Sequence, residues 1–316
     1  VGNDQWVYEG CPHRPATMGV DQQGRLYVTW YTEGPDDTPG VYLAYSDDQG
    51  ETWTARTIAP NPGSLADKNH FWVDNSPVSP YEGNLYNVWS DFGGPYDSEI
   101  VVSRSIDDGD TWTPRIPIST AVNAGSHNQG VNVNTGPNGE VYAVWAIYNN
   151  WPSDEGALGF ARSFDGGETW EDASRIIEDI RGIRTTETSK NHRVNSFPVM
   201  SVDISGGPDN GTIYVVWSNI GTPGINQNEG IDVYMIKSTD QGETWTEPIR
   251  INQNPYGEGK EHYFPWITCD PENGILSVIY YGDRDVNSNQ CEVFCANSFD
   301  AGETWEDFKV SDVAFT

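Results

Sequence analysis

An eight-residue motif, S-x-D-x-G-x-T-W, occurs five times along this 316-residue chain. The Trp residues that end the copies are separated by 59, 58, 75 and 60 residues. A period of this length is longer than a solenoid repeat and matches one four-stranded sheet per repeat. The copies are SDDQGETW (46–53), SIDDGDTW (105–112), SFDGGETW (163–170), STDQGETW (238–245) and SFDAGETW (298–305).

The residue types of the motif suit a hairpin turn. An Asp side chain accepts backbone N–H groups across a turn, Gly adopts a positive φ, and Thr and Trp restart a strand and pack beside the sheet. We therefore expect the repeated Asp residues to have a structural role rather than a catalytic one. They are Asp48, Asp107, Asp165, Asp240 and Asp300.

Each repeat also contains an apolar strand upstream of the motif, such as RLYVTWY (25–31) and TIYVVWS (212–218), which follows a Gly-bearing turn. A candidate inner strand precedes that turn, and a short outer strand follows the motif. The sequence therefore predicts an all-β propeller of four-stranded antiparallel blades in a single domain, 1–316. The five blades are expected at approximately 11–60, 70–120, 127–180, 192–252 and 262–312.

Composition limits the partners and the compartment. Lys and Arg number 17 against 47 Asp and Glu, and the net charge of -30 would repel nucleic acid and acidic membrane surfaces. No apolar run is long enough to span a bilayer. The acidity suits solubility in an extracellular medium, and a chain that begins at Val1 fits a processed product, so we expect a secreted protein.

The octapeptide resembles the bacterial neuraminidase (BNR) or Asp-box repeat of the sialidase superfamily. Members of that superfamily have six blades, whereas five are visible here. Either the ring closes with five blades, or a sixth is missing and a partner chain could supply it. In a ring of five, Cys11 and Cys291 would be neighbours at one face, and a disulfide between them is then expected.

Binding is expected at the face that carries the segments entering the inner strands. All five histidines lie in these segments, one per blade. They could simply form hydrogen bonds where the strands begin, or they could form a polar ring that contacts a ligand or, less readily, a metal. The five are His13, His70, His127, His192 and His262.

The loops between second and third strands share this face and are rich in carboxylates, among them Asp36, Asp37, Asp283 and Asp285. Trp151, Trp266 and Tyr281 add aromatic surface. Aromatic faces beside carboxylates and amides are typical of sugar-binding sites, although exposed loops are polar in any protein. We expect no cofactor; Ca²⁺ could bind the acidic loops, but no segment has calcium-loop spacing.

The sialidase resemblance implies roles for particular residues. His13-Arg14-Pro15 looks like the family's Arg-Ile-Pro signature, which implies that Arg14 grips a substrate carboxylate. The stretch after Trp30 is similar to the one that supplies the family's proton donor, here Asp36 or Asp37. The resemblance also implies two further arginines that hold the substrate carboxylate, for which Arg193 and Arg284 are the candidates. The family's nucleophilic Tyr and its partner Glu would be Tyr280 or Tyr281 with Glu261.

These patterns together predict an extracellular, glycan-directed propeller. It could be a sialidase-like exo-glycoside hydrolase that acts at the channel mouth. The alternatives are a non-catalytic carbohydrate-binding or adhesive propeller and a structural extracellular propeller. Fold alone does not choose between them.

Overall fold

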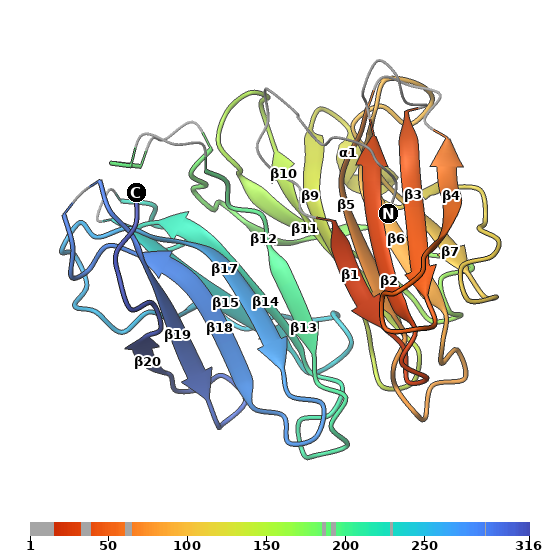
Figure 1. The fold of residues 1–316 in the computed structure, drawn as a ribbon. Helices are drawn as coiled ribbons and strands as arrows, with labels where there is room; N and C mark the ends of the chain where they lie inside the picture. Colours follow the sequence, from red (N-terminus) through yellow and green to blue (C-terminus); the bar gives the residue numbers. More distant parts are fainter. Residues whose placement is uncertain are drawn as a thin grey trace.

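A computed structural model describes residues 16–32, 39–60, 65–184, 188–190, 194–227, 230–287 and 289–316. It contains five four-stranded antiparallel sheets, and in each sheet the strands follow one another in chain order (Figure 1). This arrangement confirms the predicted all-β propeller with five blades. Within the described ranges, no helix is long and apolar enough to cross a membrane.

The first three blades lie between residues 17 and 178. Blade 1 consists of β1 (Thr17–Val20), β2 (Leu26–Thr32), β3 (Gly40–Ser46) and β4 (Thr54–Pro60). Blade 2 consists of β5 (Leu65–Val73), β6 (Leu85–Phe92), β7 (Glu99–Ser105) and β8 (Ile116–Pro117). After the short helix α1 (Thr120–Asn123), blade 3 consists of β9 (His127–Thr135), β10 (Val141–Tyr148), β11 (Ala157–Ser163) and β12 (Ser174–Glu178).

The last two blades follow the longest connection between sheets, from 179 to 198. Blade 4 consists of β13 (Val199–Val202), β14 (Ile213–Ile220), β15 (Ile231–Ser238) and β16 (Ile249–Arg250). Blade 5 consists of β17 (His262–Cys269), β18 (Leu276–Gly282), β19 (Glu292–Ser298) and β20 (Glu306–Lys309).

Each Asp box forms the turn between the third and fourth strands of its blade. In the first copy, Asp48 accepts hydrogen bonds from the Thr52 backbone N–H at 2.8 Å and from the Thr52 hydroxyl at 2.5 Å. The Ser46 hydroxyl donates to the same carboxylate, and the Trp53 indole N–H donates to the Gly50 carbonyl. These hydrogen bonds lower the pKa of Asp48 to about 2. The carboxylate therefore holds the turn together, as the sequence predicts.

The core lies between neighbouring sheets. All eight residues of β10 and all eight of β14 are buried, because both faces of these strands pack against another blade. In blades 2, 3 and 4, one Trp of the second strand fills the space toward the preceding blade, and these three residues, Trp89, Trp145 and Trp217, are all buried. Apolar clusters join blades 1–2, 2–3, 3–4 and 4–5.

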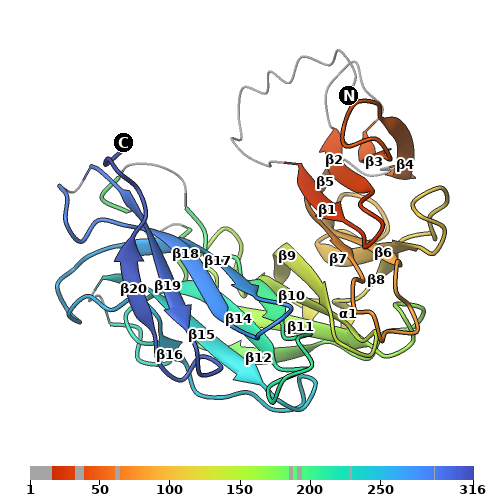
Figure 2. The same cartoon turned by 60° about the horizontal axis from the view of Figure 1, so that its bottom comes forward.

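The sheets form an arc in which blade 1 and blade 5 occupy the two ends (Figure 2). The outward face of blade 1 leaves Met18 65% exposed, and the outward face of blade 5 leaves Ile279 48% exposed. Among the described residues, blades 1 and 5 therefore do not pack against each other.

Cys291 is a free cysteine in the structure, and its Sγ lies 2.8 Å from the Tyr263 hydroxyl. This contradicts the expected disulfide to Cys11, which lies outside the described residues. The physical reason is that the disulfide required blade 5 to meet blade 1, whereas the arc is open between them.

Candidate functional site

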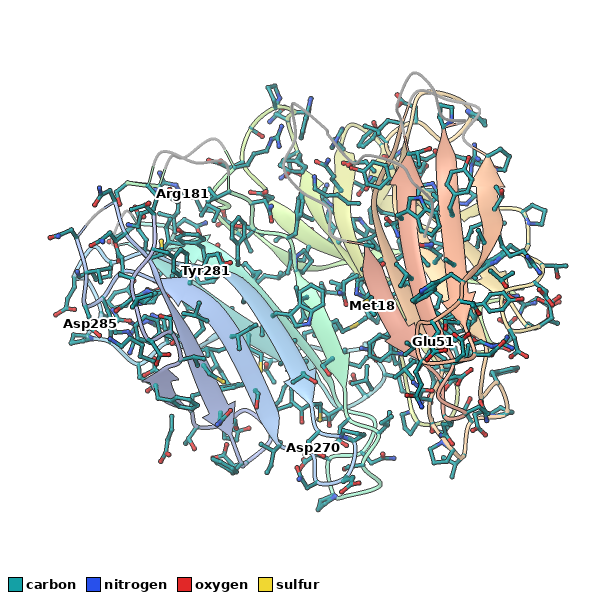
Figure 3. The ribbon with its side chains drawn as sticks, in the orientation of Figure 1. Met18, Glu51, Arg181, Asp270, Tyr281 and Asp285 are labelled. Carbon is teal, nitrogen blue, oxygen red and sulfur yellow. The ribbon has the colours of Figure 1, made fainter. Side chains whose placement is uncertain are left out.

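The loops expected to carry function lie at one end of the sheets, which we call the mouth face. In Figure 3, Arg181 and Asp285, which belong to these loops, lie at the end of the sheets opposite to Glu51 and Asp270. Glu51 belongs to an Asp box, and Asp270 follows β17 in the turn that leads to β18. The repeated motif and the candidate site therefore occupy opposite faces.

Four side chains of the mouth face form one continuous stack. The His127 ring lies 5.0 Å from Phe92 and 4.0 Å from Trp151, nearly parallel to both. The Arg184 guanidinium carbon lies 4.1 Å from the Trp151 ring centroid. Two groups at such distances cannot share one face of an indole, so His127 and Arg184 cover its two sides. Trp151 is thus better placed to support Arg184 than to stack on a sugar itself.

Arg184 differs from most cations of this acidic chain. Arg25, Arg104 and Arg162, for example, all form ion pairs with carboxylates on the Asp-box side. Among the described residues, no carboxylate contacts the Arg184 side chain, whose recorded partners are the rings of Trp151 and Tyr148. Within the described part of the chain, its guanidinium donors thus have no carboxylate partner, and a guanidinium of this kind can bind a carboxylate through two hydrogen bonds.

A buried carboxylate fixes the backbone that carries Arg184. Glu155, which is 1% exposed, accepts hydrogen bonds from the backbone N–H groups of Ile183, Arg184 and Ser196 at 3.1, 3.3 and 3.2 Å. The Tyr148 hydroxyl donates to the same side chain at 2.8 Å. Burial raises the pKa of Glu155. Its contacts hold the connection between blades 3 and 4 against the end of β10.

A nearly buried carboxylate, Asp67, lies on the blade 2 side of this stack. It is 7% exposed, receives a hydrogen bond from the Gln129 side chain, and lies 3.5 Å from the Lys68 ammonium. Gln129 stands two residues after His127 on β9, so both side chains lie on the same side of that strand. Blade 2, blade 3 and the connection that follows blade 3 thus bring a carboxylate, an amide, an imidazole and a guanidinium to one rim.

The inner strands also bring two predicted binding residues together. Trp266 on β17 is 49% exposed, and its ring centroid lies 6.0 Å from that of His70 on β5. His70 is buried, and the Val133 N–H donates to its Nδ1. Lys68 lies over the ring of Phe197 at 4.7 Å. Trp266 therefore offers an exposed aromatic surface close to the inner strand of blade 2.

The proposed nucleophile pair of blade 5 shares one side of the sheet. Tyr281 pairs with Tyr263 on the neighbouring strand, and Gly282 pairs with His262. Glu261 is two residues before Tyr263, so its side chain lies on the same side of the sheet as those of Tyr263 and Tyr281. Glu261 accepts hydrogen bonds from Ser189 and Lys190, and the Lys190 ammonium lies 2.6 Å from Asp283. Among described contacts, none joins the Tyr281 hydroxyl to Glu261. The pair stays a prediction, and Glu261 serves here to anchor the 188–190 segment.

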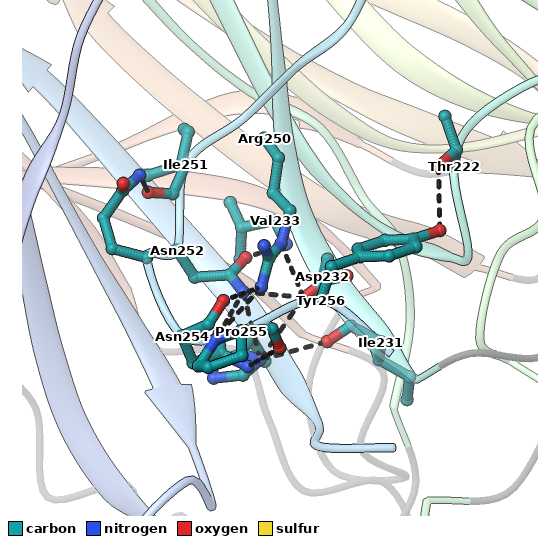
Figure 4. A network of polar contacts seen from close by, with 12 residues as sticks. Thr222, Ile231, Asp232, Val233, Arg250, Ile251, Asn252, Asn254, Pro255 and Tyr256 are labelled. Atoms are coloured by element: carbon teal, nitrogen blue, oxygen red, sulfur yellow. Dashed lines mark hydrogen bonds and ion pairs between the residues drawn. The ribbon is translucent and has the colours of Figure 1, made fainter. Parts of the chain in front are cut away.

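His262 and Arg284 lie within polar networks that brace blades 4 and 5. Asn252 joins Asp232 and Asn254 with hydrogen bonds of 2.6 and 2.7 Å, and Arg250 lies 3.1 Å from Asp232 (Figure 4). The His262 ring, which is fully buried, contacts Asn252 at 3.3 Å. Arg284 pairs with Asp307 and with the Tyr280 hydroxyl. These contacts favour a structural role for both residues over the substrate contacts that the sequence predicts.

Several predicted residues lie outside the described ranges. They are Arg14, His13, Asp36, Asp37, His192 and Arg193. Their roles therefore stay predictions. In the part of the chain that the structure describes, no three His, Cys, Asp or Glu residues gather in a geometry that could hold a metal ion.

Sequence reasoning missed Arg184, Glu155 and Asp67. A signal for the first was present, since Arg181, Arg184, Lys190 and Arg193 concentrate four of the chain's 17 basic residues in the connection between blades 3 and 4. Glu155 and Asp67 gave no such signal, because carboxylates are common throughout the chain and only folding reveals which of them are buried.

The three described histidines are expected to stay neutral well below pH 6. Burial lowers the pKa of His70, His127 and His262 to about 4 in each case, against 6.5 for an exposed imidazole. Between pH 4 and pH 6.5, these three histidines bind more protons in the unfolded chain than in the folded one. The stability that the neutral, buried imidazoles contribute is therefore complete above pH 6.5 and is lost as the pH falls toward 4. NMR titration of the imidazole C–H signals should show three midpoints near 4; midpoints near 6.5 would contradict the burial of these rings.

Comparison with known proteins decides the family. The sequence matches the BNR repeat-like domain over residues 8–196, more than half of its length. The chain belongs to the BNR repeat-like domain family. No curated protein matches this BNR chain in sequence.

Solved structures share the fold of this BNR protein at low sequence identity. An ulvan lyase, a polysaccharide lyase, superposes with a TM-score of 0.60 and 10% identity over 94% of this chain and 69% of its own. An α-L-arabinofuranosidase from Fusarium graminearum gives 0.57 and 17% over 93% and 80%. A Hadza microbial sialidase gives 0.57 and 16% over 93% and 57%. At these identities the likeness concerns the fold.

Proposed function

We propose that this BNR propeller is a secreted glycan-directed protein that holds an acidic sugar at the mouth face, at the rim of blades 2 and 3. The observation that carries the proposal is the position of Arg184, a guanidinium stacked on Trp151 with no described carboxylate partner in a chain of net charge -30. A guanidinium fork matches the two oxygens of a sugar carboxylate. Neighbouring His127, Gln129 and Lys68 supply polar groups for ring hydroxyls.

The acidity of the chain restricts the places where an acidic glycan can bind. A polyanionic glycan is repelled by the overall charge, so binding is favourable only where cations locally outweigh it. The connection that carries Arg181 and Arg184 is such a place. The glycan-active propellers with the same fold support a glycan as the ligand class.

Cleavage of the bound glycan is a second candidate function, in line with the sialidase-like hydrolase that the sequence suggests. Asp67 favours it, because Gln129 and Lys68 orient this nearly buried carboxylate beside the same rim. A carboxylate so placed can act as a general base that accepts a proton from a water attacking the glycosidic bond. The proposed chemistry uses side chains and water and requires no cofactor.

Calorimetric titration with sialylated and uronate-containing oligosaccharides, and with neutral ones of equal length, tests the binding proposal. We expect the acidic set to bind at least about tenfold more tightly, which corresponds to about 1.4 kcal/mol. Equal affinity for both sets, or no binding to either, would contradict it. A panel of chromogenic glycosides, sialosides included, tests cleavage: turnover that Asp67→Asn abolishes supports hydrolysis, and absence of turnover leaves a binding protein.

A further inference from the structure

A polar cavity lies on the Asp-box face, between blades 3 and 4. It is enclosed by the turn between β9 and β10, the turn between β13 and β14, and the Asp box of blade 4. Its volume of about 360 Å³ falls within the range of small-molecule sites, which is about 300–1,000 Å³. Its lining includes the amides of Asn138, Asn210 and Gln241 and the hydroxyls of Tyr142 and Thr239. The cavity is therefore separate from the rim that carries Arg184, which belongs to the mouth face.

The Tyr142 side chain lines this cavity and has a hydroxyl in need of a partner. Tyr142 is 1% exposed, and among the described residues none forms a hydrogen bond with its hydroxyl. The equivalent hydroxyls of blades 1 and 2, from Tyr27 and Tyr86, form hydrogen bonds of 3.0 and 3.3 Å within the protein, and that of Tyr214 in blade 4 is buried. Burial raises the pKa of Tyr142, so its hydroxyl stays protonated and can both donate and accept. A buried polar group of this kind is stabilised by a molecule that reaches it through the cavity.

A second buried group of the lining, Glu140, retains capacity for a further donor. Glu140 is 5% exposed and accepts hydrogen bonds from the backbone N–H and the side-chain amide of Asn138 at 2.9 and 3.1 Å. The side-chain amide of Gln241 donates to it at 2.9 Å. A carboxylate offers about four acceptor positions, and these three donors leave one of them, on Oε2. All three donors are neutral, so the negative charge of Glu140 has no described counter-ion.

The cavity as a whole is negatively charged. Asp240 of the Asp box belongs to the lining together with Glu140, whereas none of the described lining residues is Lys, Arg or His. Arg162 pairs with Tyr142 across β10 and β11, but its guanidinium is bound by the carboxylates of Glu171 and Glu243. A ligand in the cavity therefore meets uncompensated negative charge together with neutral amides and hydroxyls.

We propose that this cavity binds a hydroxylated ligand with a protonated amine, as an amino sugar presents. An ammonium group has three donors, and both Glu140 Oε2 and the Tyr142 oxygen can accept from it. Asn210 and Thr239 supply polar groups for ring hydroxyls, and Pro137 supplies apolar surface for the ring. The net charge of -30 attracts a cation to this face. The proposal does not depend on the acidic-glycan site, which lies at the opposite face.

Calorimetric titration with a glucosamine disaccharide and with the corresponding glucose disaccharide tests the ligand class. At physiological ionic strength we expect the amino sugar to bind one site per chain at least about tenfold more tightly, because hydrogen bonds to charged groups are stronger than neutral ones. Arg184→Ala should leave this affinity unchanged, which separates the result from the acidic-glycan site. Equal affinity for the two disaccharides, or no binding of the amino sugar, would overturn the proposal.

Substitution of the two buried groups tests the location. Glu140→Gln should weaken binding of the amino sugar at least about tenfold, and Tyr142→Phe about two- to tenfold. The thermal midpoint of Tyr142→Phe should stay unchanged, since its hydroxyl has no described partner in the protein. Tyr86→Phe is the matched control, because it removes the equivalent hydroxyl from blade 2 and should leave the affinity unchanged.

Three further outcomes would contradict the assignment. Unchanged affinity in both cavity variants would show that the amino sugar is attracted only by the overall charge of the chain. Stoichiometric displacement of the disaccharide by Ca²⁺ would identify a metal site instead. A lowered thermal midpoint of Tyr142→Phe would show that the hydroxyl already has a partner within the protein.

Discussion

Trp217→Ala is expected to lower the free energy of unfolding by about 3–5 kcal/mol, the range measured when large aromatic side chains are removed from protein cores. Trp217 is fully buried between blades 3 and 4, and its ring lies 6.2 Å from that of Tyr234. Neighbouring blades are rigid sheets, so they cannot close the cavity that the indole leaves. For a chain of this size the thermal midpoint should fall by roughly 10 °C.

Trp266→Ala is the matched control for this prediction. The residue is also a strand Trp, but it is 49% exposed on the outward face of blade 5. We expect its loss to cost less than about 2 kcal/mol, because much of its surface is already in contact with water. Denaturant unfolding of both variants gives the two values. Equal losses of unfolding free energy in the two variants would show that contacts between blades do not stabilise the fold.

Arg184→Ala is expected to weaken binding of an acidic oligosaccharide by about 10–100-fold. Hydrogen bonds to charged groups contribute about 1.5–3 kcal/mol, and no described neighbour can replace the lost guanidinium. Arg184→Lys should give an intermediate loss, because an ammonium keeps the charge but not the planar fork. Calorimetric titration at fixed ionic strength measures both effects.

Arg162→Ala is the control for Arg184, since it removes the same charge from the opposite face. Arg162 pairs with Glu171 and Glu243 beside two Asp boxes. Its removal should leave affinity unchanged within about twofold, because charges separated by more than a Debye length are screened at physiological salt. If both variants weaken binding equally, net charge rather than a defined site controls the interaction.

The fold could be predicted from the sequence because its signal is local and repeated. Each Asp box specifies its own turn through contacts within eight residues, as the hydrogen bonds that Thr52 donates to Asp48 show. The common face of the candidate site loops also followed from strand order, since alternate connections of a meander lie at the same end.

The site itself could be predicted only in part. The aromatic and histidine positions pointed to the rim that carries His127 and Trp151, but the stack that joins them to Arg184 depends on the path of a long connection between blades. That path is set by Glu155, whose three backbone partners lie 28 to 41 residues further along the chain. Long-range contacts of this kind have no local pattern in a single sequence.

The most direct test of the account is to locate the bound glycan by NMR. In a titration with a uronate oligosaccharide, the Arg184 Nε–H and the His127 ring signals should shift and reach saturation together. The Arg162 and His262 signals should stay unchanged. Saturable shifts confined to Arg162 and the Asp-box face, or no shift at Arg184 while binding occurs, would contradict a glycan site at the rim of blades 2 and 3.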